Sequence, residues 1–242
     1  MSISFIDELN AWEQSEALLT LKECGLSEGM NVLDFGCGVP HYSFPAAKVV
    51  GNGGLVYAVD KSNHILELVK SRANEENITN IQPIKADEKK IINFNNPVQF
   101  IMYYDCFHGI GEGMNGRIEE NEKLFREFYR ILGGGGILSI AIYKEITYVM
   151  DYTKEPTEII SPSGKRKLQR KWLRVSYDEA FNEWYKLIPL VESCGFKLKK
   201  VIKDGGIHFD DIDFKLHLNK NKNIRLSDLE RRDIYNFEKV AV

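Results

Sequence analysis

Short apolar runs along this chain alternate with stretches in which hydrophobic residues recur every three to four positions. The apolar runs are bounded by glycines or polar residues, which is typical of buried strands. Five of them predict strands at residues 31–35, 55–60, 81–86, 98–104 and 137–143. The stretches with helical periodicity predict helices at residues 5–24, 41–50, 62–76, 117–131 and 177–193.

The C-terminal part breaks this alternation. Residues 196–202 and 213–218 alternate hydrophobic and polar side chains, as strands do when one face is wet. Since no helix is expected between them, we predict a hairpin-like pair with one strand antiparallel at the sheet edge. Residues 225–238 are expected to form a further exposed helix. The whole pattern predicts a mostly parallel α/β sheet with helices on both faces.

Composition and charge narrow the function classes. The chain has 242 residues, 43% hydrophobic and 28% charged, and its net charge of −3 gives no broad reason to expect a nucleic-acid partner. None of the four cysteines forms a CxxC pair, so neither a zinc site nor a redox motif is indicated. The first residues carry acids and no basic region, and no apolar run reaches ~18 residues. We therefore expect a cytoplasmic protein without membrane insertion.

The sharpest motif is VLDFGCGVP at residues 32–40. A strand leads to Gly36 and Gly38, which can adopt positive φ and let the backbone come close to a ligand. A helix starts just beyond, so its free N–H groups face the same place. Asp34 stands two residues before the first glycine, where its carboxylate could hold the loop by accepting N–H groups.

Two further acids follow the next two predicted strands. Asp60 ends the second strand, where a carboxylate can accept hydrogen bonds from both hydroxyls of a ribose. Asp87 follows the third strand, where it can accept from an adenine amino group. A lone GxG is common in structural turns, and a lone Asp60 is more often a helix cap. The set, gathered at the carboxyl edge of one sheet, predicts a nucleotide-type cofactor.

These residues resemble those of class I S-adenosylmethionine-dependent methyltransferases. The matching pieces fall in the family's order: VLDFGCG (32–38), VYAVD (56–60), IKAD (84–87), FIMYYDCFHGI (100–110) and FYRILGGGGILSI (128–140). The resemblance implies a doubly wound, mostly parallel seven-stranded α/β sheet of the Rossmann-like type with an antiparallel terminal strand pair. It also implies S-adenosylmethionine as cofactor, with the methionine part along the loop, the ribose at Asp60 and the adenine at Asp87. Tyr103 and Tyr104 would then lie at the rim beside the reactive methyl group. The cofactor-binding residues that the resemblance implies are Asp34, Gly36, Gly38, Asp60, Lys61, Ala86, Asp87, Tyr103 and Tyr104.

Two positions depart from the family pattern. Pro40 stands where the family usually has a third glycine, and proline lacks an N–H, although it suits the first turn of a helix. Gln99 stands where an acid usually begins the fourth strand. NAD is the rival cofactor, but its G-x-G-x-x-G fingerprint needs a glycine at position 41, which is His41.

A sulfonium methyl group is already activated, so the protein mainly aligns donor and acceptor and excludes water. A base is needed only if the acceptor must lose a proton, and the catalytic candidates are His108 and Asp105, just past the fourth strand. No metal site is expected, because the acids near residues 210–213 precede an edge strand, where charges usually face water.

We expect an N-terminal helical cap (residues 1–30), a methyltransferase domain (31–218) and a C-terminal extension (219–242). Residues 144–175 are expected to be an irregular insertion, whose basic stretch at 162–174 could act as a lid over an anionic acceptor. The predicted function is methyl transfer to a small molecule. The alternatives are a non-catalytic cofactor-binding protein, or a nucleic-acid or protein methyltransferase that docks through the basic stretch. The sequence leaves the oligomeric state open.

Overall fold

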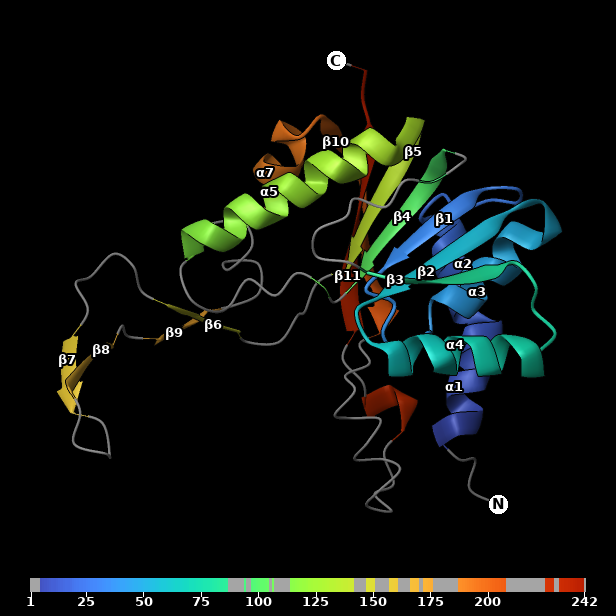
Figure 1. Ribbon diagram of the computed structural model, residues 1–242, viewed down its shortest axis with the longest axis horizontal. Coiled ribbons are helices and arrows are strands. Elements are labelled where there is room, and N and C mark those ends of the chain that lie inside the picture. Colours follow the sequence, from blue (N-terminus) through green and yellow to red (C-terminus); the bar gives the residue numbers. More distant parts are fainter. Residues whose placement is uncertain are drawn as a thin grey trace.

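Seven strands form a single sheet in the order β10-β11-β5-β4-β1-β2-β3 (Figure 1). The computed structural model describes residues 5–86, 94, 97–104, 106, 114–141, 147–150, 157–160, 166–169, 172–175, 187–207, 225–228 and 231–241. The strands of the sheet are β1 (Asn31–Phe35), β2 (Leu55–Asp60), β3 (Ile81–Lys85), β4 (Val98–Tyr104), β5 (Leu132–Ala141), β10 (Phe196–Ile207) and β11 (Arg231–Lys239). Six of these strands run parallel, and β11 is antiparallel to both of its neighbours. The predicted fold class is confirmed.

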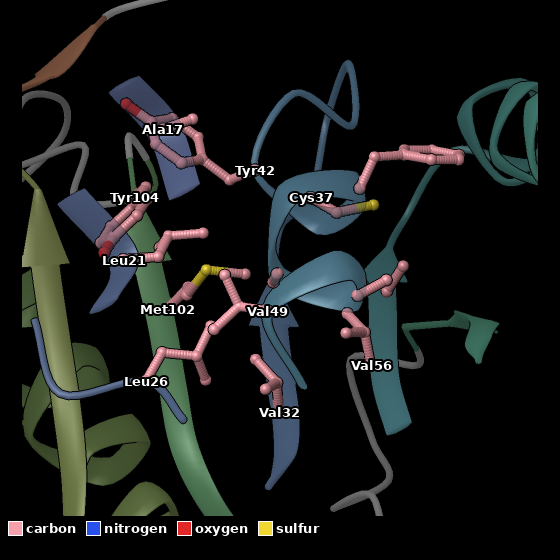
Figure 2. Packing of buried hydrophobic residues seen from close by; sticks show 14 of the residues in the cluster. Ala17, Leu21, Leu26, Val32, Cys37, Tyr42, Val49, Val56, Met102 and Tyr104 are labelled. Carbon is pink, nitrogen blue, oxygen red and sulfur yellow. The ribbon is translucent and has the colours of Figure 1, made fainter. Parts of the chain in front are cut away.

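Helices cover both faces of this sheet (Figure 1). One face carries α1 (Phe5–Gln14), α2 (Glu16–Glu23), α3 (Ser43–Val50) and α4 (Asn63–Glu75). The other carries α5 (Met114–Ile131) and α7 (Leu187–Ser193). Because successive side chains of a strand point to opposite faces, Phe100 and Met102 of β4 join the first core and Ile101 joins the second. Met102 packs with Leu21 and Val49 of the first core in Figure 2.

The N-terminal half follows the predicted pattern closely. Strands β1, β2 and β4 have the expected bounds, and α4 begins after Ser62, whose hydroxyl accepts a 3.4 Å hydrogen bond from the Ile65 N–H. The helix predicted at 5–24 is divided at Ser15 into α1 and α2. The Ser15 hydroxyl donates to the carbonyl of Ala11, a side-chain bond that competes with the helical ladder and bends helices.

The seventh strand is a correction to the prediction. Residues 225–238 were expected to form an exposed helix, but β11 spans Arg231–Lys239 and lies between β10 and β5. Both faces of β11 are covered, so Ile234, Tyr235 and Phe237 are all buried and the alternation that marks a half-wet strand is lost. The sheet therefore reaches into the expected extension, and the antiparallel strand lies one place inside the edge. Residues 213–218 fall outside the described part.

The glycine run before β5 is a second difference. Gly133 to Gly136 were expected to separate helix and strand, but they belong to β5, which starts at Leu132. Pairing with β4 jumps from Leu132 opposite Val98 to Ile137 opposite Phe100. The intervening glycines form an irregularity of the kind that glycine permits inside a strand.

The insertion at 144–175 contains four short strands rather than an irregular chain. The strands β6 (Thr147–Met150) and β9 (Trp172–Val175) pair antiparallel, and so do β7 (Thr157–Ile160) and β8 (Arg166–Gln169). Both ribbons lie away from the sheet in Figure 1. Of the helix expected at 177–193, the described part contains α7. Among the described residues, no helix has the length and apolar character needed to cross a membrane.

Candidate functional site

The loop between β1 and α3 carries the two glycines of the sequence motif. Gly36 and Gly38 have φ values of +75° and +49°, a region that favours glycine. The N–H groups of Gly36 and Cys37 donate to the carbonyl of Val59 at 2.8 and 2.9 Å. The N–H of Gly38 donates to Oδ2 of Asp60 at 3.1 Å. The end of β2 therefore holds the first half of the loop.

The two glycines face different surroundings. A Cβ atom at Gly36 would lie 2.1 Å from the Sγ atom of Cys106, so this thiol covers the first glycine. Burial raises the pKa of Cys106 to about 12, and the protonated thiol donates to the carbonyl of Phe35 at 3.1 Å. Within the described part of the chain, a Cβ atom at Gly38 would meet only the Gly36 carbonyl oxygen, at 3.9 Å. The backbone at Gly38 is therefore open to a ligand, which fits the expected cofactor.

Asp60 joins the loop to the helix that follows β2. One carboxylate oxygen accepts from the Gly38 N–H, and the other accepts from the N–H of Ser62 at 2.7 Å. The side chain is half-buried, and a carboxylate offers about four acceptor positions in all. Asp60 therefore acts as a cap, as a lone acid there often does, and keeps acceptor capacity for the hydroxyls of a ribose.

Asp34 is more deeply buried than an acid that contacts a ligand needs to be. It is 4% exposed, and its Oδ2 accepts a 2.5 Å hydrogen bond from the hydroxyl of Ser43, the first residue of α3. Burial raises the pKa of Asp34 to about 7, with the Ser43 hydrogen bond opposing the rise and the charge of Asp60 adding to it. Asp34 was expected to accept N–H groups of the loop, whereas the hydrogen bonds from Gly36, Cys37 and Gly38 go to β2.

The second half of the loop depends on residues that sequence reasoning missed. The Tyr42 hydroxyl accepts from the Ile207 N–H at 2.7 Å and donates to the Ile207 carbonyl at 3.0 Å, on β10. The Tyr42 ring packs between Trp12 of α1 and Tyr104 of β4, with centroids 5.4 and 4.8 Å away; Tyr42 and Tyr104 appear in Figure 2. These contacts join residues far apart in the sequence, so no local pattern could have marked them.

The ends of β3 and β4 place the other predicted cofactor residues. Lys61 follows Asp60 directly, and its carbonyl accepts from the side chain of Lys85. The N–H of Ala86 donates to the carbonyl of Asp60 at 2.9 Å, so Ala86 lies beside the expected ribose position. Asp87, which was expected to bind adenine, lies outside the described residues.

The two tyrosines of β4 point to opposite faces of the sheet. Tyr103 is 3% exposed, with its hydroxyl 3.1 Å from Oδ1 of Asn121, and belongs to the core under α5. Tyr104 is 6% exposed, with its hydroxyl 2.8 Å from that of Ser139. Such burial suits wall residues behind the loop, and contact with the reactive methyl group stays a prediction.

The catalytic candidates Asp105 and His108 lie outside the described residues. Gln99, which replaces the acid usual in the family at the start of the fourth strand, has a structural role. Its Oε1 accepts from the Asn31 N–H at 2.7 Å, and its Nε2 donates to the carbonyl of Pro97 at 2.9 Å. The amide therefore ties the beginning of β4 to that of β1. Because an amide makes both bonds, the missing acid has no structural cost there.

Comparison with known proteins agrees with this geometry. The sequence model of the methyltransferase domain family matches residues 26–177, more than half of the chain. A demethylmenaquinone methyltransferase from Listeria welshimeri is 27% identical over 77% of this chain and 78% of that protein. One of the same name from Listeria monocytogenes is 27% identical over 50% of this chain, and the match spans about half of that relative, 47%.

The fold has solved counterparts as well. A SAM-dependent methyltransferase from Aquifex aeolicus superposes with a TM-score of 0.58 at 22% identity, over 95% of this chain and 92% of that one. That similarity supports the fold. With the family match and the glycine loop, it confirms the resemblance seen in the sequence: the chain belongs to the methyltransferase domain family and is an S-adenosylmethionine-dependent methyltransferase of class I.

Proposed function

We propose that S-adenosylmethionine binds along the loop at residues 34–38, with its ribose at Asp60 and its adenine beside Ala86 and Asp87. The observation that carries this proposal is the pairing of an open backbone at Gly38 with a half-buried carboxylate at Asp60, 3.1 Å from its N–H. Lys61 stands next to Asp60, at the rim of the same strand ends. Tyr103 and Tyr104 support the loop from behind, through Cys106 and Tyr42.

The reaction that we propose is methyl transfer to a small acceptor. When bound, the cofactor supplies a methyl group that its positive sulfur already activates for nucleophilic attack. The chain then has to align the acceptor with that methyl group and exclude water. The loop at residues 34–38, Asp60 and Ala86 would hold the cofactor, which would supply its methyl group to the acceptor atom and be left as S-adenosylhomocysteine. Where the acceptor atom carries a proton, we propose that His108 or Asp105 takes it.

For the acceptor we propose a demethylated menaquinol-type ring. The curated relatives are named demethylmenaquinone methyltransferases. A ring carbon that gains a methyl group must lose a hydrogen as a proton. The acid-base candidates after β4 could accept that proton. The net charge of −3 supports a small acceptor over a nucleic acid, because nucleic-acid binding depends on many phosphate contacts.

Calorimetry with S-adenosylhomocysteine and with NAD tests the cofactor. We expect binding of the thioether and none of NAD, and the reverse result would contradict the proposal. A turnover assay with S-adenosylmethionine and a short-chain demethylmenaquinol then tests the acceptor. Methylation of a nucleic acid or protein in place of the quinol would favour the alternative acceptor classes. Salt-sensitive binding to DNA or RNA in a gel shift would point the same way.

A further inference from the structure

One buried carboxylate joins the N-terminal helix to the glycine loop. Glu13 of α1 is 2% exposed, and its Oε1 lies 2.6 Å from Nδ1 of His41 and 3.0 Å from Nη1 of Arg72. Its other oxygen contacts the second terminal nitrogen of Arg72. His41, 5% exposed, follows Pro40 in the loop, and Arg72 belongs to α4. A single side chain of α1 therefore contacts both the loop and α4.

The charge of each side chain in this cluster follows from its burial and from its hydrogen-bond partners. Burial alone would raise the pKa of Glu13, but hydrogen bonds from His41 and Arg72 outweigh it and hold the pKa below its usual value. Burial lowers the pKa of His41, although the bond to Glu13 opposes this. A neutral His41 thus donates its Nδ1–H to an ionised Glu13, and the guanidinium of Arg72 balances the charge. A buried carboxylate is retained where it is paired in this way.

The two halves of the loop are held differently. Residues 36–38 are held by backbone and side-chain acceptors at the end of β2, directly beside the loop. Residues 39–42 include Pro40, which has no N–H to donate. Their side chains reach distant elements instead: His41 contacts α1, and Tyr42 contacts β10. Arg72 also stacks over Phe44 of α3, 4.0 Å from the ring centroid, so the cluster extends to the helix that follows the loop.

We propose that Glu13 is a positioning residue for the cofactor loop. Through His41 it sets the conformation of residues 39–42, so that docking of α1 and binding of the cofactor stabilise each other. The proposal rests on the S-adenosylmethionine site proposed above and adds a second element, far away in the sequence, to it. By thermodynamic linkage, docking of α1 raises the affinity for the cofactor by a certain factor, and the bound cofactor raises the equilibrium constant for α1 docking by the same factor.

The first test is Glu13→Gln, which keeps the size of the side chain and removes its charge. We expect its Kd for S-adenosylhomocysteine to rise by about 5-fold to 150-fold, the range of coupling between linked sites. Turnover at saturating S-adenosylmethionine should stay near the wild-type value, so that KM changes and kcat does not. Glu13→Asp keeps the carboxylate and should restore part of the affinity.

Glu16→Gln is the matched control. Glu16 of α2 forms an ion pair with Arg231 of β11, so this pair also fastens the N-terminal helices to the sheet. In the described part of the chain, the hydrogen bonds of the Glu16 side chain go to Arg231 and not to the loop. Because the Glu16–Arg231 pair is half-exposed, we expect Glu16→Gln to lower the Tm less than Glu13→Gln does and to leave the Kd unchanged. Equal Kd values for Glu13→Gln, Glu16→Gln and the wild type would overturn the proposal, because Glu13 would then be only structural.

Hydrogen exchange measures the effect of the bound cofactor on the docking of α1. S-adenosylhomocysteine should slow exchange of the amides of residues 5–14 in the wild type and in Glu16→Gln, and much less in Glu13→Gln.

If Glu13→Gln does not fold, His41→Asn removes the loop's side of the contact and leaves the Glu13–Arg72 pair, with the same expected rise in Kd. A wild-type Kd in His41→Asn would overturn the coupling alone. Absence of binding by the wild type would overturn the proposed function, and this proposal with it.

Discussion

The hydroxyl of Ser43 donates a 2.5 Å hydrogen bond to Oδ2 of Asp34, joining the first residue of α3 to the strand that precedes the glycine loop. Asp34 belongs to β1, so this bond spans the loop from its strand to its helix. Burial raises the pKa of Asp34 to about 7, so this carboxyl titrates near neutral pH. Its protonation state should therefore affect both ligand binding and stability.

Affinity for S-adenosylmethionine should rise with pH. The cofactor carries a positive sulfur, and the ionised form of Asp34 favours a cation nearby. With a pKa of about 7, Asp34 is mostly protonated at pH 6 and mostly ionised at pH 8. We expect roughly a tenfold gain in affinity over that interval, with release of a proton on binding. Calorimetry in two buffers of different ionisation enthalpy measures both quantities.

The control for this experiment is Asp34→Asn, whose amide oxygen can still accept from Ser43. The pH dependence of cofactor affinity between pH 6 and 8 should disappear in this variant. If the variant keeps the wild-type dependence, the titrating group lies elsewhere and Asp34 does not face the methionine part.

Asp34→Asn should also stabilise the protein above neutral pH. The folded pKa of about 7 lies above the ordinary value of 3.8, so the folded state holds the proton more tightly than the unfolded state does. The contribution of this group to stability is therefore greatest below pH 3.8 and falls as the pH rises to about 7. At pH 8 the free energy of unfolding should increase by up to roughly 4 kcal/mol in Asp34→Asn, and at pH 4 it should change little. Urea unfolding at the two pH values measures the difference.

Alanine at the two loop glycines should separate folding from binding. Both positions have positive φ, which costs alanine about 1–2 kcal/mol. At Gly36 the new Cβ atom would also collide with Cys106, so Gly36→Ala should lower the Tm strongly. At Gly38 the space is open, so Gly38→Ala should fold with a small loss and bind S-adenosylhomocysteine poorly. Thermal melts and calorimetry decide between the two effects, and normal binding by Gly38→Ala would place the cofactor elsewhere.

Asp60 should matter more for binding than its cap alone explains. Asp60→Ala removes the proposed ribose acceptor and the partner of the Gly38 N–H, and binding of S-adenosylhomocysteine should weaken by about 1.5–3 kcal/mol. Ser62→Ala removes only the N-cap of α4, which should cost about 1 kcal/mol of stability and leave affinity unchanged. Calorimetry on the pair gives the comparison. Equal affinities in the two variants would mean that Asp60 is only a cap.

Local patterns predicted the parallel part of this fold well. The runs before Gly36 and at Asp60 are short, apolar and followed by polar or glycine residues, so both their strand type and their bounds could be read from the sequence. The strand at 231–239 could not be read in this way. Its side chains are buried on both faces, and the buried set includes the polar Arg232, Asp233 and Asn236, so neither an apolar run nor a period of two marks the strand.

The residues of the site also divide into those that a local pattern predicts and those that it does not. Gly36 and Gly38 stand in one local motif, Asp60 ends the next predicted strand, and the structure brings all three together. Glu13 and Tyr42 hold the same loop through contacts with residues 28 and 165 positions away along the chain. Such contacts depend on how helices and strands pack, and neither composition nor periodicity carries them. His41 offered a partial signal, since it stands where a dinucleotide fingerprint has glycine.

The acid-base candidates after β4 give the last prediction. A quinol ring carbon that receives a methyl group must lose a proton, and the chain leaves β4 at Tyr104, with Asp105 and His108 directly following. His108→Asn should lower turnover by about 10²-fold or more and leave the affinity for S-adenosylhomocysteine nearly intact. Asp105→Asn, measured beside it over pH 6–9, shows which of the two groups sets the pH profile. Full activity of His108→Asn across that range would mean that alignment alone carries the reaction. Loss of cofactor binding would instead place His108 in the cofactor wall.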